Sequence, residues 1–178
     1  HIRDIISFVE ASPTSYHAVA ELTRRLEQAG FQRLEETESW PSVEGRRYVV
    51  RDGAVIAWIT PEKVTPQLGA RIVGSHTDSP SFKLKPNATV TNQGWQQVGM
   101  EVYGGGLLNS WLDRDLGLSG RLVTCDGQAH LVRTGPILRI SQLAPHLDRT
   151  VNDDLKLDRQ RHLMPILSVG KPDLDVED

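Results

Sequence analysis

The sequence contains a single cysteine, Cys125, and therefore cannot form an intramolecular disulfide. It has no apolar run approaching the roughly 20 residues that a membrane-spanning helix needs. Its first residues lack the apolar core and small-residue cleavage site of a signal peptide. Neither sign of charge dominates, and a net charge of −3 gives no electrostatic basis for binding nucleic acid. These absences predict that neither nucleic acid nor a membrane is a partner, and they favour a reducing, cytoplasmic location.

Several catalytic motifs are also missing. There is no Gly-x-Ser-x-Gly nucleophile elbow. Cys125 lies beside a predicted turn, Asp126-Gly127, and has no cationic neighbour in the sequence to favour a reactive thiolate. The single cysteine also excludes a zinc finger. The triplet Gly104-Gly105-Gly106 lacks the wider spacing of a phosphate-binding loop, so it is interpreted as a flexible or tight connection.

The chain of 178 residues, with 38% apolar and 24% charged residues, is typical of one globular domain, or of one domain and part of a second. It begins with His1 instead of Met. Its last residues, 171–178, are acidic and aperiodic, like a loop that leads into further structure. We therefore expect the natural polypeptide to continue beyond this sequence.

The first 60 residues predict two helices and a hairpin. Apolar residues recur at helical spacing over residues 2–9, and Ser12-Pro13 interrupts the pattern. Ser15 is the expected N-cap of a second helix that ends at Gly30. Strands over residues 48–51 and 54–59 flank Asp52-Gly53, a strong hairpin signal.

After the hairpin, the pattern of apolar and polar residues changes. A loop over residues 61–69 and a short buried strand over 71–75 lead into a histidine. From about residue 85 the pattern becomes β-rich, with strands expected over residues 96–103, 116–124 and 129–133. The sequence therefore predicts an α/β fold, with one domain over residues 1–84 and a β-rich domain over 85–178.

The most informative motif is Ser75-His76-Thr77-Asp78-Ser79-Pro80. In an extended backbone, residues i and i+2 point to the same side, so His76 and Asp78 can face one point in space. A metal-binding imidazole usually has its second nitrogen held by a carboxylate or carbonyl. His76 is therefore a candidate metal ligand and Asp78 its orienting partner. The alternative is a surface turn with a hydrogen-bonded histidine, which is common.

Other polar residues are weaker candidates for a functional role. The cluster Asp113-Arg114-Asp115 is interpreted as a structural ion pair at a domain or subunit contact, with a catalytic role as the minority alternative. His146, in an apolar stretch, is either packed or functional. The histidines at positions 17, 130 and 162 are expected to be packed or hydrogen-bonded.

Taken together, six stretches resemble the aspartyl aminopeptidase family of dinuclear zinc exopeptidases. They occur in the family's order and extend over nearly the whole chain. The motif around His76 is one of them, and Ala11-Ser12-Pro13-Thr14-Ser15-Tyr16-His17-Ala18 is another. The full set is residues 11–18, 73–80, 101–106, 110–116, 136–140 and 143–149.

The resemblance implies roles for three residues. His76 would be the first zinc ligand, and Asp78 the carboxylate that orients it. His146 would contact substrate in a neighbouring subunit's active site, or else bind metal. The resemblance also implies two zinc ions per active site, a dodecameric homo-oligomer, and removal of N-terminal Asp or Glu from peptides. Residues 1–84 would begin a zinc-exopeptidase catalytic domain, and residues 85–178 would belong to a dimerisation domain.

The chain also departs from the family, whose members are much longer. The metal-bridging aspartate, the general-base glutamate and the remaining metal ligands of the family lie beyond the point where this sequence stops. We therefore expect the chain to be inactive by itself and to need the remainder of its own polypeptide. Two alternatives stay open: a non-catalytic assembly fragment, and a related zinc hydrolase with another substrate.

Overall fold

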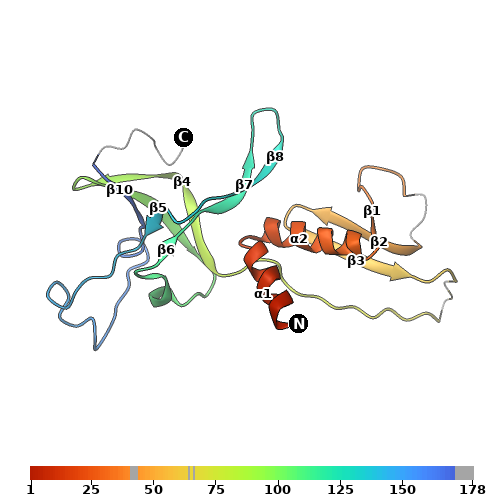
Figure 1. Ribbon diagram of the computed structural model, residues 1–178, viewed down its shortest axis with the longest axis horizontal. Helices are drawn as coiled ribbons and strands as arrows, with labels where there is room; N and C mark the ends of the chain where they lie inside the picture. Colours follow the sequence, from red (N-terminus) through yellow and green to blue (C-terminus); the bar gives the residue numbers. More distant parts are fainter. Residues whose placement is uncertain (41–43, 64, 66, 171–178) are drawn as a thin grey trace. The chain divides into compact units, whose positions relative to one another are not determined.

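The computed structural model describes residues 1–40, 44–63, 65 and 67–170 (Figure 1). This part of the chain is mixed α/β and forms two compact units. The first unit contains residues 1–79 and 119–132, and the second contains residues 80–118 and the described chain from 133 onward. The predicted boundary after residue 84, with a catalytic role before it and a dimerisation role after it, stays a prediction.

Two helices open the first unit, as predicted. Helix α1 spans Ile2–Ala11 and helix α2 spans Ser15–Gln28. The N-cap of α2 is Thr14 and not Ser15, because the Thr14 hydroxyl accepts a hydrogen bond from the backbone N–H of His17 at 3.3 Å. Gly30 follows the helix end at φ +81°, a left-handed conformation that glycine adopts without strain.

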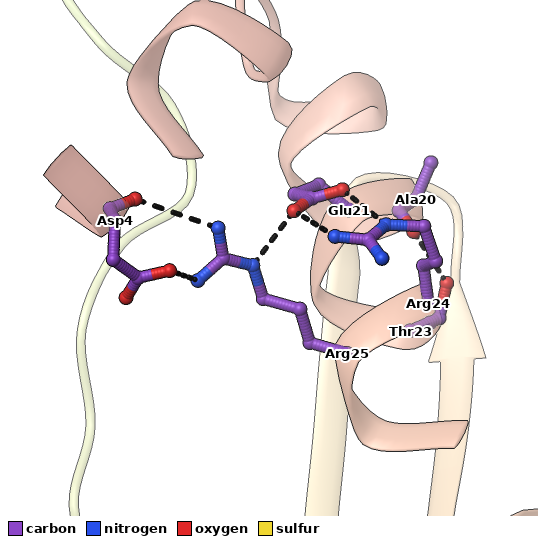
Figure 2. A network of polar contacts seen from close by, with 6 residues as sticks. All are labelled: Asp4, Ala20, Glu21, Thr23, Arg24 and Arg25. Atoms are coloured by element: carbon purple, nitrogen blue, oxygen red, sulfur yellow. Dashed lines mark hydrogen bonds and ion pairs between the residues drawn. The ribbon is translucent and has the colours of Figure 1, made fainter. Parts of the chain in front are cut away.

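An ion-pair network joins the two helices (Figure 2). Glu21 accepts hydrogen bonds from Arg24 at 2.6 and 2.7 Å and from Arg25 at 2.7 Å. Arg25 also donates to the Asp4 carboxylate on α1 at 2.8 Å. The hydrogen bonds from Arg24, and then those from Arg25, lower the pKa of Glu21 to about 2. Glu21 therefore organises this face of α2 in its charged form.

Replacing Glu21 with glutamine will lower the free energy of unfolding at neutral pH by about 1 kcal/mol. The folded-state pKa is depressed from 4.5 to about 2, so the contribution of Glu21 is complete above pH 4.5 and disappears as pH falls through 2. Urea unfolding at a series of pH values will show wild type and variant converging between these limits. A stability difference that does not change with pH would contradict the assignment.

The first unit also contains a small sheet in the order β1-β2-β3. Strand β1 is Gln32–Arg33, β2 is Gly45–Arg51 and β3 is Ala54–Thr60. The predicted hairpin is confirmed, with Arg51 opposite Ala54 across a two-residue turn. Tyr48 on β2 is fully buried, and its hydroxyl donates to Glu27 of α2 at 2.6 Å. Helix α2 therefore packs on this sheet through an anchored aromatic side chain.

A second hairpin belongs to the first unit although it comes late in the sequence. Strands β7 (Ser119–Val123) and β8 (Ala129–Arg133) pair around a turn in which Gly127 has φ +82°. The predicted strand over 116–124 is therefore two strands, because β6 (Asp115–Leu116) pairs in a different sheet. Strand β8 lies where it was predicted.

The buried strand predicted over residues 71–75 is not formed within the described part of the chain. This segment has no regular secondary structure, and no strand in the described part of the chain pairs with it. Its apolar side chains face solvent, with 89% of Ile72 and 98% of Val73 exposed. A buried strand in a parallel sheet needs neighbours on both sides and layers that cover its faces, and the described residues provide neither.

The second unit is built on a five-stranded sheet in the order β4-β5-β10-β9-β6, with antiparallel neighbours throughout. Its long strands are β4 (Ser81–Asn92) and β5 (Trp95–Tyr103). A short 3₁₀ helix, η1 (Leu108–Trp111), precedes β6, and β9 (Leu138–Arg139) and β10 (Ile166–Val169) complete the sheet. The hydrophobic core of the unit is formed by Ala88, Val98, Met100 and Leu138.

The connections of the second unit carry several of the residues singled out in the sequence. The glycine triplet follows β5, where Gly104 has φ +75°. A long irregular segment between β9 and β10 contains His146 and His162. The predicted C-terminal loop, residues 171–178, lies outside the described residues. Within the described ranges, every helix is too short or too polar to cross a membrane.

Candidate functional site

His76 is an exposed histidine whose ring is hydrogen-bonded within its own motif, which agrees with a metal ligand and equally with the alternative of a surface turn that holds a hydrogen-bonded histidine. His76 Nδ1 lies 2.8 Å from the backbone carbonyl oxygen of Asp78 and 3.3 Å from its carboxylate Oδ1. Because the carbonyl can only accept, this contact assigns the Nδ1 proton to the hydrogen bond and leaves Nε2 with its lone pair. The side chain of His76 is 80% exposed, so Nε2 is open to a ligand.

This donor arrangement fits zinc at one position. An imidazole whose Nδ1–H is held by a carbonyl or carboxylate has a fixed orientation and a more basic Nε2. One ligand is not a complete site. Among the residues that the structure describes, there is no cluster of three or more His, Cys, Asp and Glu side chains able to hold a metal ion. The assignment of His76 as ligand and Asp78 as orienting residue stays a prediction.

The residue between them has a contact that the sequence did not suggest. Thr77 is half-buried, and its hydroxyl donates to the backbone carbonyl of Gly53 at 2.6 Å. The motif is therefore attached to the β2–β3 turn through its middle residue. In the sequence, this threonine looks like a residue that only separates the histidine from the aspartate. The hydrogen bond is therefore found only in the structure.

His146 lies in a tight turn of the second unit and is exposed. The backbone N–H groups of Leu147 and Asp148 donate to the carbonyl of Ala144 at 2.9 and 3.1 Å. The Asp148 carboxylate accepts hydrogen bonds from the backbone N–H and the hydroxyl of Thr150 at 3.2 and 3.0 Å. The turn is thus fixed by its own hydrogen bonds, and within the described residues its histidine is exposed. The packed or hydrogen-bonded interpretation of His146 and the functional one both stay predictions.

The segment around this turn also lines a cavity of about 250 Å³ within the second unit. Leu143 and Asp148, on either side of His146 in the sequence, are among its lining residues, together with Val151 and Met164. The flanks of the turn therefore border this cavity, and His146 itself is not one of its lining residues.

The charged cluster at residues 113–115 takes part in an ion pair, as predicted, through its two aspartates and Arg139. Its predicted place at a domain or subunit contact stays a prediction. Arg139 on β9 donates to Asp115 at 3.0 Å and lies 3.7 Å from the Asp113 carboxylate. Asp115 and Arg139 are opposite each other in the β6–β9 pair. All three side chains are at least half exposed, so their contribution to stability is small.

The remaining histidines agree with the hydrogen-bonded interpretation where contacts are seen. His17 Nδ1 lies 2.8 Å from the Thr14 hydroxyl at the start of α2. His162 Nδ1 accepts from the backbone N–H of Asp158 at 3.0 Å. His130 is exposed on β8, and Cys125 is an exposed free thiol in the adjoining turn.

Comparison with known proteins identifies a family that this chain matches. Residues 8–178 match the family described as Aminopeptidase I zinc metalloprotease (M18). The probable M18 family aminopeptidase 2 of Streptomyces avermitilis is 55% identical over 172 residues, which are 96% of this chain and 40% of that protein. The same protein of Mycobacterium leprae is 44% identical, and the match includes 94% of this chain and 41% of the relative.

Solved structures agree in fold. The crystal structure of prApe1 superposes with a TM-score of 0.86 at 30% identity, over 98% of this chain and 39% of that one. The S. cerevisiae mApe1 dodecamer superposes with a TM-score of 0.76 at 29% identity, over 93% of this chain and 37% of the other. The chain therefore spans about two fifths of the length of these relatives, and by its match over residues 8–178 it belongs to the M18 family of aminopeptidases.

Proposed function

We propose that this chain forms the N-terminal part of a zinc-dependent aminopeptidase and contributes His76 to its metal centre. The single observation that carries the proposal is the hydrogen bond from His76 Nδ1 to the Asp78 carbonyl at 2.8 Å, which leaves Nε2 free on an exposed side chain. The M18 family, described as zinc metalloproteases, supports zinc as the metal. Two ions per active site, as the family resemblance implies, are part of the proposal.

The chain's own contribution to the chemistry is to hold and orient one ligand. Zinc, when bound, supplies Lewis-acid activation of water and of the peptide carbonyl. The Asp78 carbonyl and carboxylate fix the tautomer and the angle of the His76 ring, so that Nε2 faces a defined point. The general base and the other ligands belong to the remainder of the polypeptide.

Two observations support a requirement for that remainder. The relatives are about two and a half times longer than the matched region, which is 40% of the Streptomyces protein. The segment before His76 presents Ile72 and Val73 to solvent at 89% and 98% exposure. Apolar side chains at a strand-like position are normally covered, so further strands of the same polypeptide are the partner we propose here.

The substrate and assembly follow from the family resemblance. We assign peptides with an N-terminal Asp or Glu as substrates, and His146 as the residue that contacts them from a neighbouring subunit. Homo-oligomerisation, with the dodecamer as the expected state, is supported by the S. cerevisiae mApe1 dodecamer. A cytoplasmic location is supported by the single, unpaired cysteine.

The test is hydrolysis of an aspartyl anilide by the full-length polypeptide that contains this chain. Release of aniline should be lost on treatment with a chelator and restored by zinc. The glutamyl anilide should also be cleaved, whereas leucyl and lysyl anilides should be poor substrates. Cleavage that is insensitive to chelator would refute the metal mechanism, and a preference for leucyl anilide would favour the related hydrolase with another substrate.

The second candidate function is a non-catalytic assembly fragment. It is favoured by the lack of a multi-residue metal cluster among the described residues. Intact mass of the purified natural protein separates the two proposals. A polypeptide, or a co-purifying second fragment, that extends well beyond residue 178 supports the enzyme. A homogeneous product that ends at residue 178 and binds no zinc supports the assembly fragment.

A further inference from the structure

In the described part of the chain, no sheet holds the backbone segment that carries His76. Residues 70–79 have no ladder hydrogen bonds to any strand within the described part of the chain. A metal ligand must be held within about 0.5 Å and about 10–20° of its working position. Other contacts of this segment must therefore supply that precision.

Thr77 provides one such contact. His76 Nδ1 is held by Asp78, whereas the hydroxyl of Thr77, the residue between them, donates to the Gly53 carbonyl at 2.6 Å. A single residue thus attaches the backbone midway between the ligand and its orienting partner.

The acceptor is itself held firmly. A Cβ atom built on Gly53 would lie 2.7 Å from Ser15 Oγ and 3.0 Å from Ser15 Cβ, so the start of α2 packs directly against this turn. Only glycine permits so close an approach. The glycine whose carbonyl receives Thr77 therefore packs against the first turn of a helix.

Arg121 holds the same turn from another element. Its guanidinium donates to the Asp52 carboxylate at 2.5 Å and lies over the Tyr16 ring, with 4.5 Å between Arg121 Cζ and the ring centroid. The hydrogen bond to Asp52 raises the pKa of Arg121, which therefore stays charged. Strand β7 thereby ties the β2–β3 turn to α2, adjacent to the glycine that receives Thr77.

We propose that Thr77 is a positioning residue for the metal centre, and that the turn Asp52-Gly53, clamped by Ser15 and Arg121, is the rigid base on which it acts. The inference rests on the proposed function, because it needs His76 to bind zinc. Thr77 touches neither metal nor substrate in this scheme. The hydrogen bond from Thr77 fixes the backbone of the two residues next to it, so that the Asp78 carbonyl already accepts the hydrogen bond from His76 Nδ1 before zinc binds.

The test compares zinc affinity in the full-length protein carrying Thr77→Val, Thr77→Ser or no change. Valine keeps the shape and removes the hydroxyl, whereas serine keeps the hydroxyl. Competition with a chromophoric chelator should show about 10-fold weaker zinc binding for Thr77→Val and near wild-type binding for Thr77→Ser. The rate of zinc loss to excess chelator should rise by a similar factor.

Thr124→Val is the matched control. Thr124 lies in the same unit, and its hydroxyl donates to the Asp126 carboxylate at 2.5 Å, within the connection between β7 and β8 and not to the His76 motif. This variant removes a comparable hydrogen bond and should leave zinc affinity unchanged, even if it lowers the thermal midpoint. All variants are compared below their thermal midpoints, with circular dichroism confirming the fold.

The outcomes separate the two proposals. If the unaltered protein does not bind zinc, the proposed function fails. If it binds zinc and Thr77→Val binds equally well, the function stands and the positioning role is overturned. Equal weakening by Thr77→Val and Thr124→Val would show a general loss of stability and would also overturn the positioning role.

Discussion

Replacing His76 with alanine will reduce zinc-dependent aminopeptidase activity of the full-length protein by more than about 100-fold, since even residues that only orient a ligand cost 10- to 100-fold. The fold will be unaffected. His76 is 80% exposed, and its contacts are to Asp78, two residues away in the chain. Exposed positions of this kind usually change stability by no more than about 0.5 kcal/mol.

Zinc content and activity should be measured together on the same preparation. We expect His76→Ala to bind less metal per subunit and to regain no activity when zinc is added back. His130→Ala is the matched control, because His130 is also an exposed histidine of the first unit but has no role in the proposal. If His76→Ala keeps full activity and full zinc occupancy, the ligand assignment is wrong.

Local features of the fold could be predicted because they depend on neighbouring residues alone. The two N-terminal helices follow from apolar spacing, and Gly30 ends α2 at φ +81° because few other residues accept that conformation. The hairpin around Asp52-Gly53 likewise follows from its turn chemistry. The prediction of Ser15 as N-cap was wrong by one residue, because Thr14 and Ser15 are both good caps at adjacent positions.

Burial could not be predicted for residues 71–75. An apolar run shows that a segment is suited to burial, but its actual burial depends on what packs against it. Ile72 and Val73 have the composition of an inner strand and are exposed. Strand β4 was missed for a different reason: Pro86 and the register shift between Leu84 and Thr89 interrupt its alternation.

The contacts of the candidate site are likewise of two kinds: local contacts, which the sequence predicts, and contacts between distant segments, which it does not. The pairing of His76 with Asp78 is local and follows from the two-residue period of an extended chain. The support through Thr77, Gly53 and Arg121 joins segments 24 and 69 residues apart. The partner of Asp115 is likewise Arg139, 24 residues away, and not its neighbour Arg114. Contacts of this kind depend on the topology and have no local signature.

His146→Ala will lower activity of the full-length protein by about 100-fold while leaving its zinc content unchanged, as expected for loss of one group that stabilises bound substrate. His146 is exposed on a turn that is fixed by hydrogen bonds to Ala144, so its removal should not disturb the second unit. A parallel loss of zinc would instead support the alternative in which His146 is a metal ligand.

Mixing two inactive variants tests whether His146 acts across a subunit interface. Co-expressed His76→Ala and His146→Ala protomers, carrying different tags and purified through both, should regain activity. With random assembly, about a quarter of the sites would combine an intact His76 with an intact His146 from the neighbouring subunit. If His146 acted within its own subunit, neither type of protomer could complete a site and the mixed oligomer would stay inactive. Recovery of activity would therefore establish that this exposed histidine completes a neighbour's active site, and its absence would refute that role.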